Sequence, residues 1–254
     1  MAMNGVLVVT GGSRGIGAAV SLLAAERGYA VVVNYAGNVE AAEAVVSRIH
    51  KAGGEAIAVR GDVSQPEDVE HIFAAADRMG PLVGLVNNAG VVPPRPMRVD
   101  ETDAAELKRI FEINVTGNFL CAAAAIRRMS TKRGGRGGSI VNLSSGASKL
   151  GGAGAMVVYG ASKGAIDSFT VGLALEVAGE GIRVNAVRPG IIDTDMHASG
   201  GDAGRVARIV PTLPMLRAGT AREVAEAVLW LLSDAASYTT GGVIPVSGGR
   251  AILP

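Results

Sequence analysis

Residues 6–17, VLVVTGGSRGIG, place a short apolar run directly before a glycine-rich turn. The run of valine and leucine is typical of a buried strand, and the residues after it have helical periodicity. Gly11, Gly15 and Gly17 allow a tight turn and let backbone N–H groups approach a pyrophosphate at a helix N-terminus. A glycine triplet alone is a weak signal, but its position between a strand and a helix is the context that a dinucleotide-binding loop requires.

The rest of the chain repeats this alternation of short apolar runs and longer helical patterns. We expect strands at residues 6–10, 30–34, 55–59, 82–86, 139–143, 182–187 and 242–246. Runs that are apolar throughout are typical of parallel strands covered on both faces. Because no stretch has the composition of a linker, the sequence predicts one α/β domain over residues 1–254. Its expected fold is a doubly wound parallel sheet with helices on both faces.

Composition excludes several classes of function. The net charge is +1, from 24 basic and 23 acidic residues, so we expect no nucleic-acid or anionic-membrane partner. The basic segment KRGGRGG at 132–138 is interpreted as a solvated turn.

Cys121 is the only cysteine, and His50, His71 and His197 lack the spacing of metal ligands, so no metal site is expected. No apolar stretch approaches the ~20 residues of a membrane span, and the N-terminus lacks a basic leader, which predicts a cytoplasmic protein.

Two residues bear on the choice of dinucleotide. Enzymes that use NAD often place an acidic residue after the second strand, where it bonds the ribose 2′-hydroxyl. This chain has Asn34 there, and Arg14 lies within the glycine loop, where a guanidinium can reach a 2′-phosphate. The pair favours NADP(H) over NAD(H), although Arg14 could also be a solvated loop residue.

Five motifs occur in order: TGGSRGIG, the pair Asp62-Val63, NNAG at 87–90, YGASK at 159–163 and RPG at 188–190. Together they resemble the short-chain dehydrogenase/reductase family, over nearly the whole chain. The resemblance implies a seven-stranded Rossmann-type sheet, nicotinamide-dependent interconversion of a small-molecule alcohol and its carbonyl, and a homotetramer or homodimer. It is greatest to the 3-oxoacyl-carrier-protein-reductase-like and sugar-dehydrogenase-like branches, between which the sequence does not decide.

The same resemblance implies four catalytic residues. They are Asn114, a serine, Tyr159 and Lys163. The serine falls in NLSS, where Ser145 is assigned and Ser144 is the alternative. The implied cofactor contacts are Gly11, Ser13, Arg14, Ile16, Asn34, Asp62, Val63, Asn88, Ala89, Tyr159, Lys163, Pro189, Ile192 and Thr194. Among these, Asp62 would bond the adenine amine and Thr194 the carboxamide.

The spacing of Tyr159 and Lys163 fits proton transfer. Four residues apart, they lie on one face of a helix. A phenol has a reference pKa of about 10, and a nearby ammonium, with an oxidised nicotinamide, would lower it towards neutral pH. Tyr159 is thus the expected general acid and base, and Ser145 would stabilise charge on the carbonyl oxygen. The resemblance implies that Asn114 holds a water that connects Lys163 to solvent. The alternative is a protein that senses nicotinamide, or a scaffold, on the same fold without turnover.

Two segments are expected to decide the substrate, 146–158 and 193–217. The first is small and apolar without an obvious anion-binding cluster, and a single rim residue, Arg95, does not define a substrate class. The longer connection 193–219 has a short helical pattern at 205–210 and glycines at 200, 201 and 204. A long connection at the carboxyl edge of such a sheet is typical of a substrate lid.

Overall fold

One seven-stranded parallel sheet forms the centre of the computed structural model, which describes residues 5–153, 155–194, 196 and 200–250. The strands are β1 (Val6–Val9), β2 (Ala30–Tyr35), β3 (Ala56–Arg60), β4 (Leu82–Asn87), β5 (Gly138–Leu143), β6 (Ile182–Pro189) and β7 (Val243–Val246). Their order across the sheet is β3-β2-β1-β4-β5-β6-β7. The predicted fold class is confirmed, and each predicted strand differs from the observed one by at most two residues at either end.

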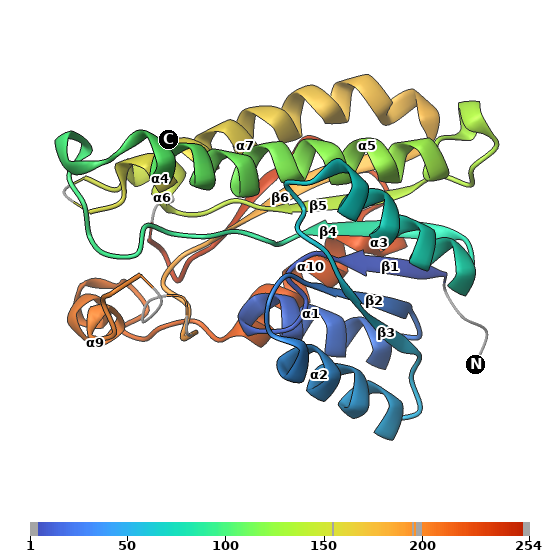
Figure 1. Ribbon diagram of the computed structural model, residues 1–254, viewed down its shortest axis with the longest axis horizontal. Coiled ribbons are helices and arrows are strands. Elements are labelled where there is room, and N and C mark those ends of the chain that lie inside the picture. Colours follow the sequence, from blue (N-terminus) through green and yellow to red (C-terminus); the bar gives the residue numbers. More distant parts are fainter. Residues whose placement is uncertain (1–4, 154, 195, 197–199, 251–254) are drawn as a thin grey trace.

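Helices cover both faces of this sheet (Figure 1). On one face lie α1 (Gly15–Glu26), α2 (Val39–Lys51) and α10 (Ala221–Leu232), and on the other α3 (Pro66–Met79), α5 (Gly117–Met129) and α7 (Val157–Val177). Three shorter helices, α4 (Ala104–Phe111), α6 (Ala147–Leu150) and α9 (Arg205–Ile209), belong to the connections.

The side chains of β1 show why the strands are apolar throughout. Val6 and Val8 pack against the layer of α3, α5 and α7, whereas Leu7 and Val9 pack against the layer of α1, α2 and α10. All four are at most 1% exposed. Successive side chains of a strand point to opposite faces, so a sheet covered twice needs apolar residues at every position.

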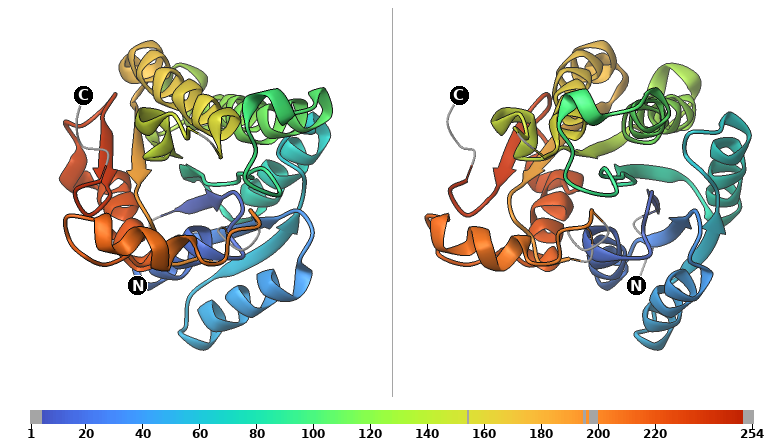
Figure 2. Two further views of the ribbon diagram at one scale, coloured as in Figure 1. Left: turned by 90° about the vertical axis from the view of Figure 1, so that its left-hand side faces the viewer. Right: turned by 60° about the vertical axis from the view of Figure 1, so that its left-hand side comes forward.

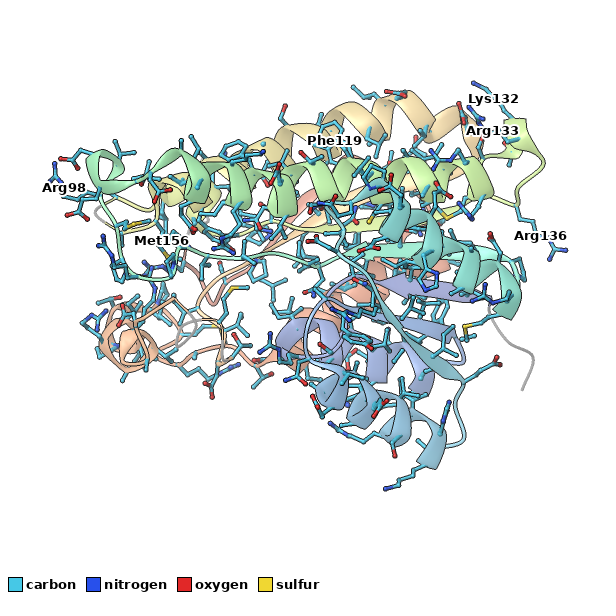
Figure 3. The ribbon with its side chains drawn as sticks, viewed as in Figure 1. Arg98, Phe119, Lys132, Arg133, Arg136 and Met156 are labelled. Carbon is cyan, nitrogen blue, oxygen red and sulfur yellow. The ribbon has the colours of Figure 1, made fainter. Side chains whose placement is uncertain are left out.

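The carboxyl ends of the strands meet at one edge of the molecule. Strand order reverses between β1 and β4, and ligands of doubly wound sheets bind at such a switch point. The short helices α4, α6 and α9 stand at this same end (Figures 1 and 2). The basic turn after α5 lies at the other end, where Lys132, Arg133 and Arg136 project away from the body (Figure 3). Within the described ranges, each helix is too short or too polar to cross a bilayer.

Candidate active site

Two adjoining cavities open at the carboxyl edge of the sheet. One, of about 630 Å³, runs along the glycine loop and the ends of β2 and β3. The other, of about 380 Å³, lies over the ends of β5 and β6. Ile16, Asn88 and Thr194 line both of them. Every residue predicted to contact the cofactor lines one of the two cavities, so the fold brings that whole set together.

The glycine loop is built for close approach. A Cβ at Gly17 would stand 2.2 Å from the carbonyl oxygen of Gly11, so only glycine fits there. Gly11 and Gly15 have φ of +60° and +51°, which favours glycine. Helix α1 begins at Gly15, and its N-cap Arg14 makes no side-chain capping bond; its first turn contains no acidic residue. The helix therefore presents backbone N–H groups to the cavity, where a pyrophosphate would satisfy them.

Asn88 joins this loop to the end of β4 by hydrogen bonds. Its Nδ2 donates to the carbonyl oxygens of Thr10 at 2.9 Å and Gly11 at 3.0 Å, and its own backbone N–H donates to Thr10 Oγ1 at 2.9 Å. These bonds hold the two strand ends of the switch point together. Asn88 thus shapes the loop in addition to lining the cavities.

Asn34 lines the larger cavity, and its contact with a ribose stays a prediction. It is 1% exposed, and its Oδ1 accepts from the Gly11 backbone N–H at 3.2 Å. Its Nδ2 donates to the carbonyl oxygens of Val59 at 3.3 Å and Gly61 at 2.9 Å. Both N–H groups of the amide are thus committed to the protein, whereas Oδ1 accepts one bond and has a second lone pair. Tyr35, the next residue, also lines the larger cavity and is only half-buried.

Asp62 and Val63 line the same cavity beyond β3. One carboxylate oxygen of Asp62, Oδ1, accepts from the Ser64 backbone N–H at 2.9 Å and the Ser64 hydroxyl at 2.8 Å. The turn therefore fixes the orientation of this carboxylate. Its contact with an adenine amine stays a prediction.

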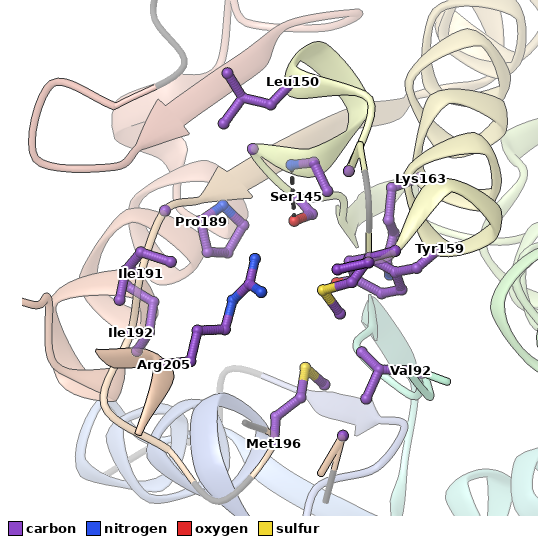
Figure 4. Close-up of a pocket in the computed structure, with 18 of the residues that line it drawn as sticks. Val92, Ser145, Leu150, Tyr159, Lys163, Pro189, Ile191, Ile192, Met196 and Arg205 are labelled. Carbon is purple, nitrogen blue, oxygen red and sulfur yellow. Dashed lines mark hydrogen bonds between the residues drawn. The ribbon is translucent and has the colours of Figure 1, made fainter. Parts of the chain in front are cut away.

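Tyr159 lies in the first turn of α7 and lines the smaller cavity (Figure 4). Burial raises the pKa of Tyr159, while a hydrogen bond with Ser145 and the charge of Arg205 act in the opposite direction. Burial is the largest effect, so the net shift of the Tyr159 pKa is upward in this structure, opposite to the lowering that the sequence predicts.

The two adjacent serines after β5 have different partners. Ser145 lines the cavity beside Tyr159, and its Oγ accepts from the Ala147 backbone N–H at 3.1 Å. Ser144 is 4% exposed, and its hydroxyl donates to Asp167 Oδ1 at 2.6 Å. The Ser144 hydroxyl is therefore committed to Asp167, whereas the Ser145 hydroxyl faces the cavity that Tyr159 lines.

Lys163 lies one helical turn after Tyr159. Its Nζ donates to the carbonyl oxygen of Leu143 at 2.6 Å and lies 5.8 Å from the centre of the Tyr159 ring. Burial lowers the pKa of Lys163 to about 8, although the charge of Asp167 acts to raise it. An amine with this pKa exchanges its proton readily near neutral pH.

Asn114 lies behind the cavity and is fully buried. It sits in a π-helical turn, Glu112–Thr116, between α4 and α5. Its Oδ1 accepts from the Val91 N–H at 2.8 Å, and its Nδ2 donates to the Val91 carbonyl oxygen at 2.9 Å. A Cβ at Gly90 would stand 3.4 Å from Asn114 Oδ1 and 3.5 Å from Lys163 Nζ, so the glycine keeps the space between these two groups open.

The connection after β6 lines one side of the smaller cavity. Its two ends are joined, because the Asp193 N–H donates to the Gly219 carbonyl oxygen and the Gly219 N–H donates to that of Ile191, both at 2.9 Å. The predicted helical pattern at 205–210 is α9, continued by a 3-10 turn, Val210–Thr212. Gly201, with φ +71°, packs against the loop before α4: a Cβ there would stand 2.8 Å from the Pro94 carbonyl oxygen. His197 lies outside the described residues.

Sequence reasoning missed several charged residues that the structure brings to the site. Arg205 and Arg250 line the smaller cavity. Asp167 and Arg188 form an ion pair of 2.8 Å behind Lys163. Asp167 could have been predicted from the sequence, because it lies four residues after Lys163 and therefore on the same helix face. No such spacing pointed to the arginines.

Other chemistry-bearing residues are placed away from this site. Cys121 is fully buried, and burial raises the pKa of its thiol to about 12. The described part of the chain contains no cluster of three or more His, Cys, Asp or Glu side chains that could hold a metal ion.

Comparison with known proteins agrees with this geometry. Residues 11–251 match a family model described as enoyl-(acyl carrier protein) reductase. The chain is 52% identical over 246 residues to the uncharacterized oxidoreductase YgfF of Escherichia coli, covering 96% of this chain and 99% of that one. It is 41% identical to cis-4-hydroxycyclohexanecarboxylate dehydrogenase of Sinomonas cyclohexanicum, covering 96% and 95%. A solved dehydrogenase/reductase from Sinorhizobium meliloti superposes with a TM-score of 0.90 at 32% identity, over 99% of this chain and 96% of that one.

Proposed function

Because the chain belongs to the short-chain dehydrogenase/reductase family, whose members are nicotinamide-dependent oxidoreductases, we propose that Tyr159 is its general acid and base and that it prefers NADP(H). The substrate is a small carbonyl compound or the corresponding alcohol. The observation that carries the proposal is that Tyr159, Ser145 and Lys163 line one cavity, which adjoins the cavity along the glycine loop.

A nicotinamide dinucleotide supplies or accepts the hydride of this reaction when it is bound. The N–H groups at the start of α1 would hold its pyrophosphate, and Pro189, Ile192 and Thr194 would surround its nicotinamide end. Tyr159 gives a proton to the substrate oxygen in reduction and takes it back in oxidation. Ser145 donates a hydrogen bond to the same oxygen as negative charge develops on it.

Lys163 assists the proton transfer at Tyr159. Its ammonium favours the phenolate, and with a pKa of about 8 it can pass a proton onward at neutral pH. The space that Gly90 leaves open between Lys163 and Asn114 is suited to a water molecule that connects this amine to solvent. The positive charge of an oxidised nicotinamide would add to that of Lys163 and offset the burial that raises the Tyr159 pKa.

The preference for NADP(H) rests on the residues at the mouth of the larger cavity. Arg14 is exposed there, and neither Asn34 nor Tyr35 at the end of β2 carries a negative charge. A guanidinium can bond a 2′-phosphate with two parallel hydrogen bonds. With Asn34 committed to the glycine loop, Tyr35 is the residue at which an acidic side chain would reject that phosphate.

A second copy of the chain is the proposed partner. The outer face of α5 and α7 exposes Phe119 by 49%, Val171 by 45% and Leu175 by 79%. Figure 3 shows Phe119 on this face, and its ring lies 3.9 Å from that of Phe169, measured between centroids. An exposed apolar face of this kind is typical of a subunit interface, and it supports the homodimer or homotetramer that the sequence predicts.

Turnover tests the proposal directly. Purified protein is mixed with NADPH and a panel of ketones and aldehydes, and with NADP⁺ and alcohols, and the absorbance of the reduced cofactor is followed. Tyr159→Phe should lower kcat by about 10²–10⁴-fold, because only the proton-transfer group is lost, and should leave cofactor affinity unchanged. A Tyr159→Phe variant that kept more than about a tenth of the activity would exclude this role. Cofactor binding without any turnover would favour a sensor or scaffold.

A further inference from the structure

Arg205 projects its charge into the apolar part of the smaller cavity, whose lining also includes the charged residues Arg95, Lys163, Asp202 and Arg250. Arg205, the first residue of α9, directs its guanidinium towards Ser145 (Figure 4). The walls around it are made largely of apolar side chains: Val92, Leu150, Pro189, Ile191, Ile192 and Met196. A charged group in such a cavity, placed among apolar walls, is the usual means of fixing the orientation of a ligand.

The charge of Arg205 is only weakly compensated. In the described part of the chain its ion pair is with Asp202, at 4.0 Å between Nη1 and Oδ2, which is longer than a hydrogen bond. The same oxygen of Asp202 accepts from Arg208 Nη2 at 2.5 Å. The Arg205 side chain is 23% exposed, so solvent screens its charge only partly.

A second cation lines the same cavity from another part of the chain. Arg250 follows β7, and burial, with a smaller effect from the charge of Arg205, lowers the pKa of the Arg250 guanidinium. The two arginines therefore repel each other across the cavity. An anion between them would remove that repulsion and accept charge-assisted hydrogen bonds from both.

The charge of Arg205 also reaches the reacting group, because it acts to lower the pKa of Tyr159. The anion site and the proposed proton donor are thus close together in one cavity of about 380 Å³, part of which the nicotinamide end of the cofactor would occupy. Because one substrate must present its anion to Arg205 and its carbonyl to Tyr159 within this cavity, a short spacer between the two groups is expected.

We propose that Arg205, supported by Arg250, binds a carboxylate of the substrate, and that the enzyme converts small oxo acids and their hydroxy acids. This inference rests on the proposed function. In reduction, the hydride adds to the ketone carbon and the proton from Tyr159 adds to its oxygen, while the carboxylate is unchanged. Arg205 neither donates nor accepts the transferred proton: it selects and positions the acid.

Kinetics with matched substrates test the selection. The probes are 3-oxobutanoate, 4-oxopentanoate and 5-oxohexanoate, each compared with its uncharged methyl ester in the presence of NADPH. For the acid with the best spacer, kcat/KM should exceed that of the ester by about ten- to a hundredfold, the range of a charged hydrogen bond. Arg205→Leu should bring this ratio close to one. Arg217→Leu removes the same charge from the same connection, at an exposed arginine paired with Glu223, and should keep the ratio.

A binding measurement separates this inference from the proposed function. Calorimetry of the protein saturated with NADP⁺ compares pentanoate with pentanamide, which cannot react. We expect pentanoate to bind more tightly in the wild type and in Arg217→Leu, but not in Arg205→Leu, whose folding is checked by a cooperative melting curve. Equal binding of both ligands, with turnover of neutral ketones, would overturn the carboxylate site and leave the reaction standing. Tighter binding of pentanoate that depends on Arg205, without turnover of any probe, would support the carboxylate site and overturn the proposed reaction.

Discussion

Asp167→Asn removes one charge from the network behind Lys163 and keeps the shape of the side chain. In the wild type, Asp167 Oδ2 pairs with Arg188 Nη2 at 2.8 Å, and Oδ1 accepts from the Ser144 hydroxyl at 2.6 Å. The side chains of the ion pair are 18% and 10% exposed. The asparagine oxygen can still accept from Ser144, so the substitution isolates the loss of charge.

The expected cost follows from this burial. Removing one partner of a fully buried ion pair costs about 3–5 kcal/mol, because the other charge is left uncompensated. Partial exposure of both side chains reduces this, and we expect the free energy of unfolding to fall by about 2–4 kcal/mol. For a chain of this size, that corresponds to a melting temperature lower by roughly 5–10 °C. Replacing Arg188 by Met in the same protein should recover part of the loss, since no unpaired charge then remains.

The dependence of the free energy of unfolding on pH provides a second test of the network. Lys163 has a pKa of about 8 in the folded protein against 10.5 for the free side chain, so between these values the unfolded state binds more protons. The free energy of unfolding should therefore rise with pH in that window. Without the Asp167 charge, which acts to raise the Lys163 pKa, the rise should begin at lower pH in Asp167→Asn.

Urea denaturation followed by circular dichroism, from about pH 7 to about pH 10, measures both effects, since the midpoint and slope give the free energy. Asp100→Asn is the matched control: Asp100 pairs with Arg98 on the surface, where loss of a charge changes stability by less than about 1 kcal/mol. If Asp167→Asn were as stable as Asp100→Asn and showed the wild-type pH profile, the network would have no influence on Lys163 and the reasoning would be refuted.

Four further changes test other parts of the site. Tyr35→Asp should weaken NADPH binding relative to NADH, and equal dissociation constants for both cofactors in the wild type would contradict the proposed preference. Gly17→Ala forces a Cβ to 2.2 Å from the Gly11 oxygen and should abolish cofactor binding in calorimetry or unfold the loop. Leu175→Glu should dissociate the assembly in light scattering after gel filtration; an unchanged mass would place the interface elsewhere. Hydrogen exchange across residues 193–219 should slow when cofactor and substrate are added, whereas unchanged protection would mean that this connection is not a lid.

The fold and most of the candidate site are predictable because they depend on local patterns. Continuous apolar runs predict the seven strands, and the motifs after them necessarily meet at one edge of a parallel sheet. Arg205 was not predictable in the same way. It is one arginine at the start of a five-residue helix, and only the path of the connection across the sheet edge directs it into the cavity. The pair of Asp167 with Arg188 likewise joins α7 to β6, a contact that no spacing along the chain specifies.

Successive side chains of a strand point to opposite faces, and this alternation explains two finer features of the site. They are the different surroundings of Ser144 and Ser145 and those of Asn34 and Tyr35. In β5, Ile140 packs against the layer of α7 and Val141 against the opposite layer. The hydrogen bonds between β5 and β6 continue to Ser144, whose N–H donates to the Val187 carbonyl oxygen at 2.9 Å. Ser144 lies four residues after Ile140, so its side chain points to the same face and reaches Asp167 on α7. Ser145 then emerges into the cavity.

The same alternation operates at the end of β2. Val33 and Tyr35 belong to the layer of α1, α2 and α10, which leaves Asn34 on the other face, where backbone groups of the glycine loop and β3 occupy its amide. An alternating strand would reveal this parity in its sequence, because its polar positions mark one face. A strand covered on both faces is apolar at every position, so the pattern that identifies the fold also hides which of two neighbouring side chains enters the site. The parity becomes visible only once the helices that pack against each face are known. All four residues line the cavities, but the Ser144 hydroxyl and the Asn34 amide bond to neighbouring protein groups, whereas Ser145 and Tyr35 point to the opposite faces of their strands.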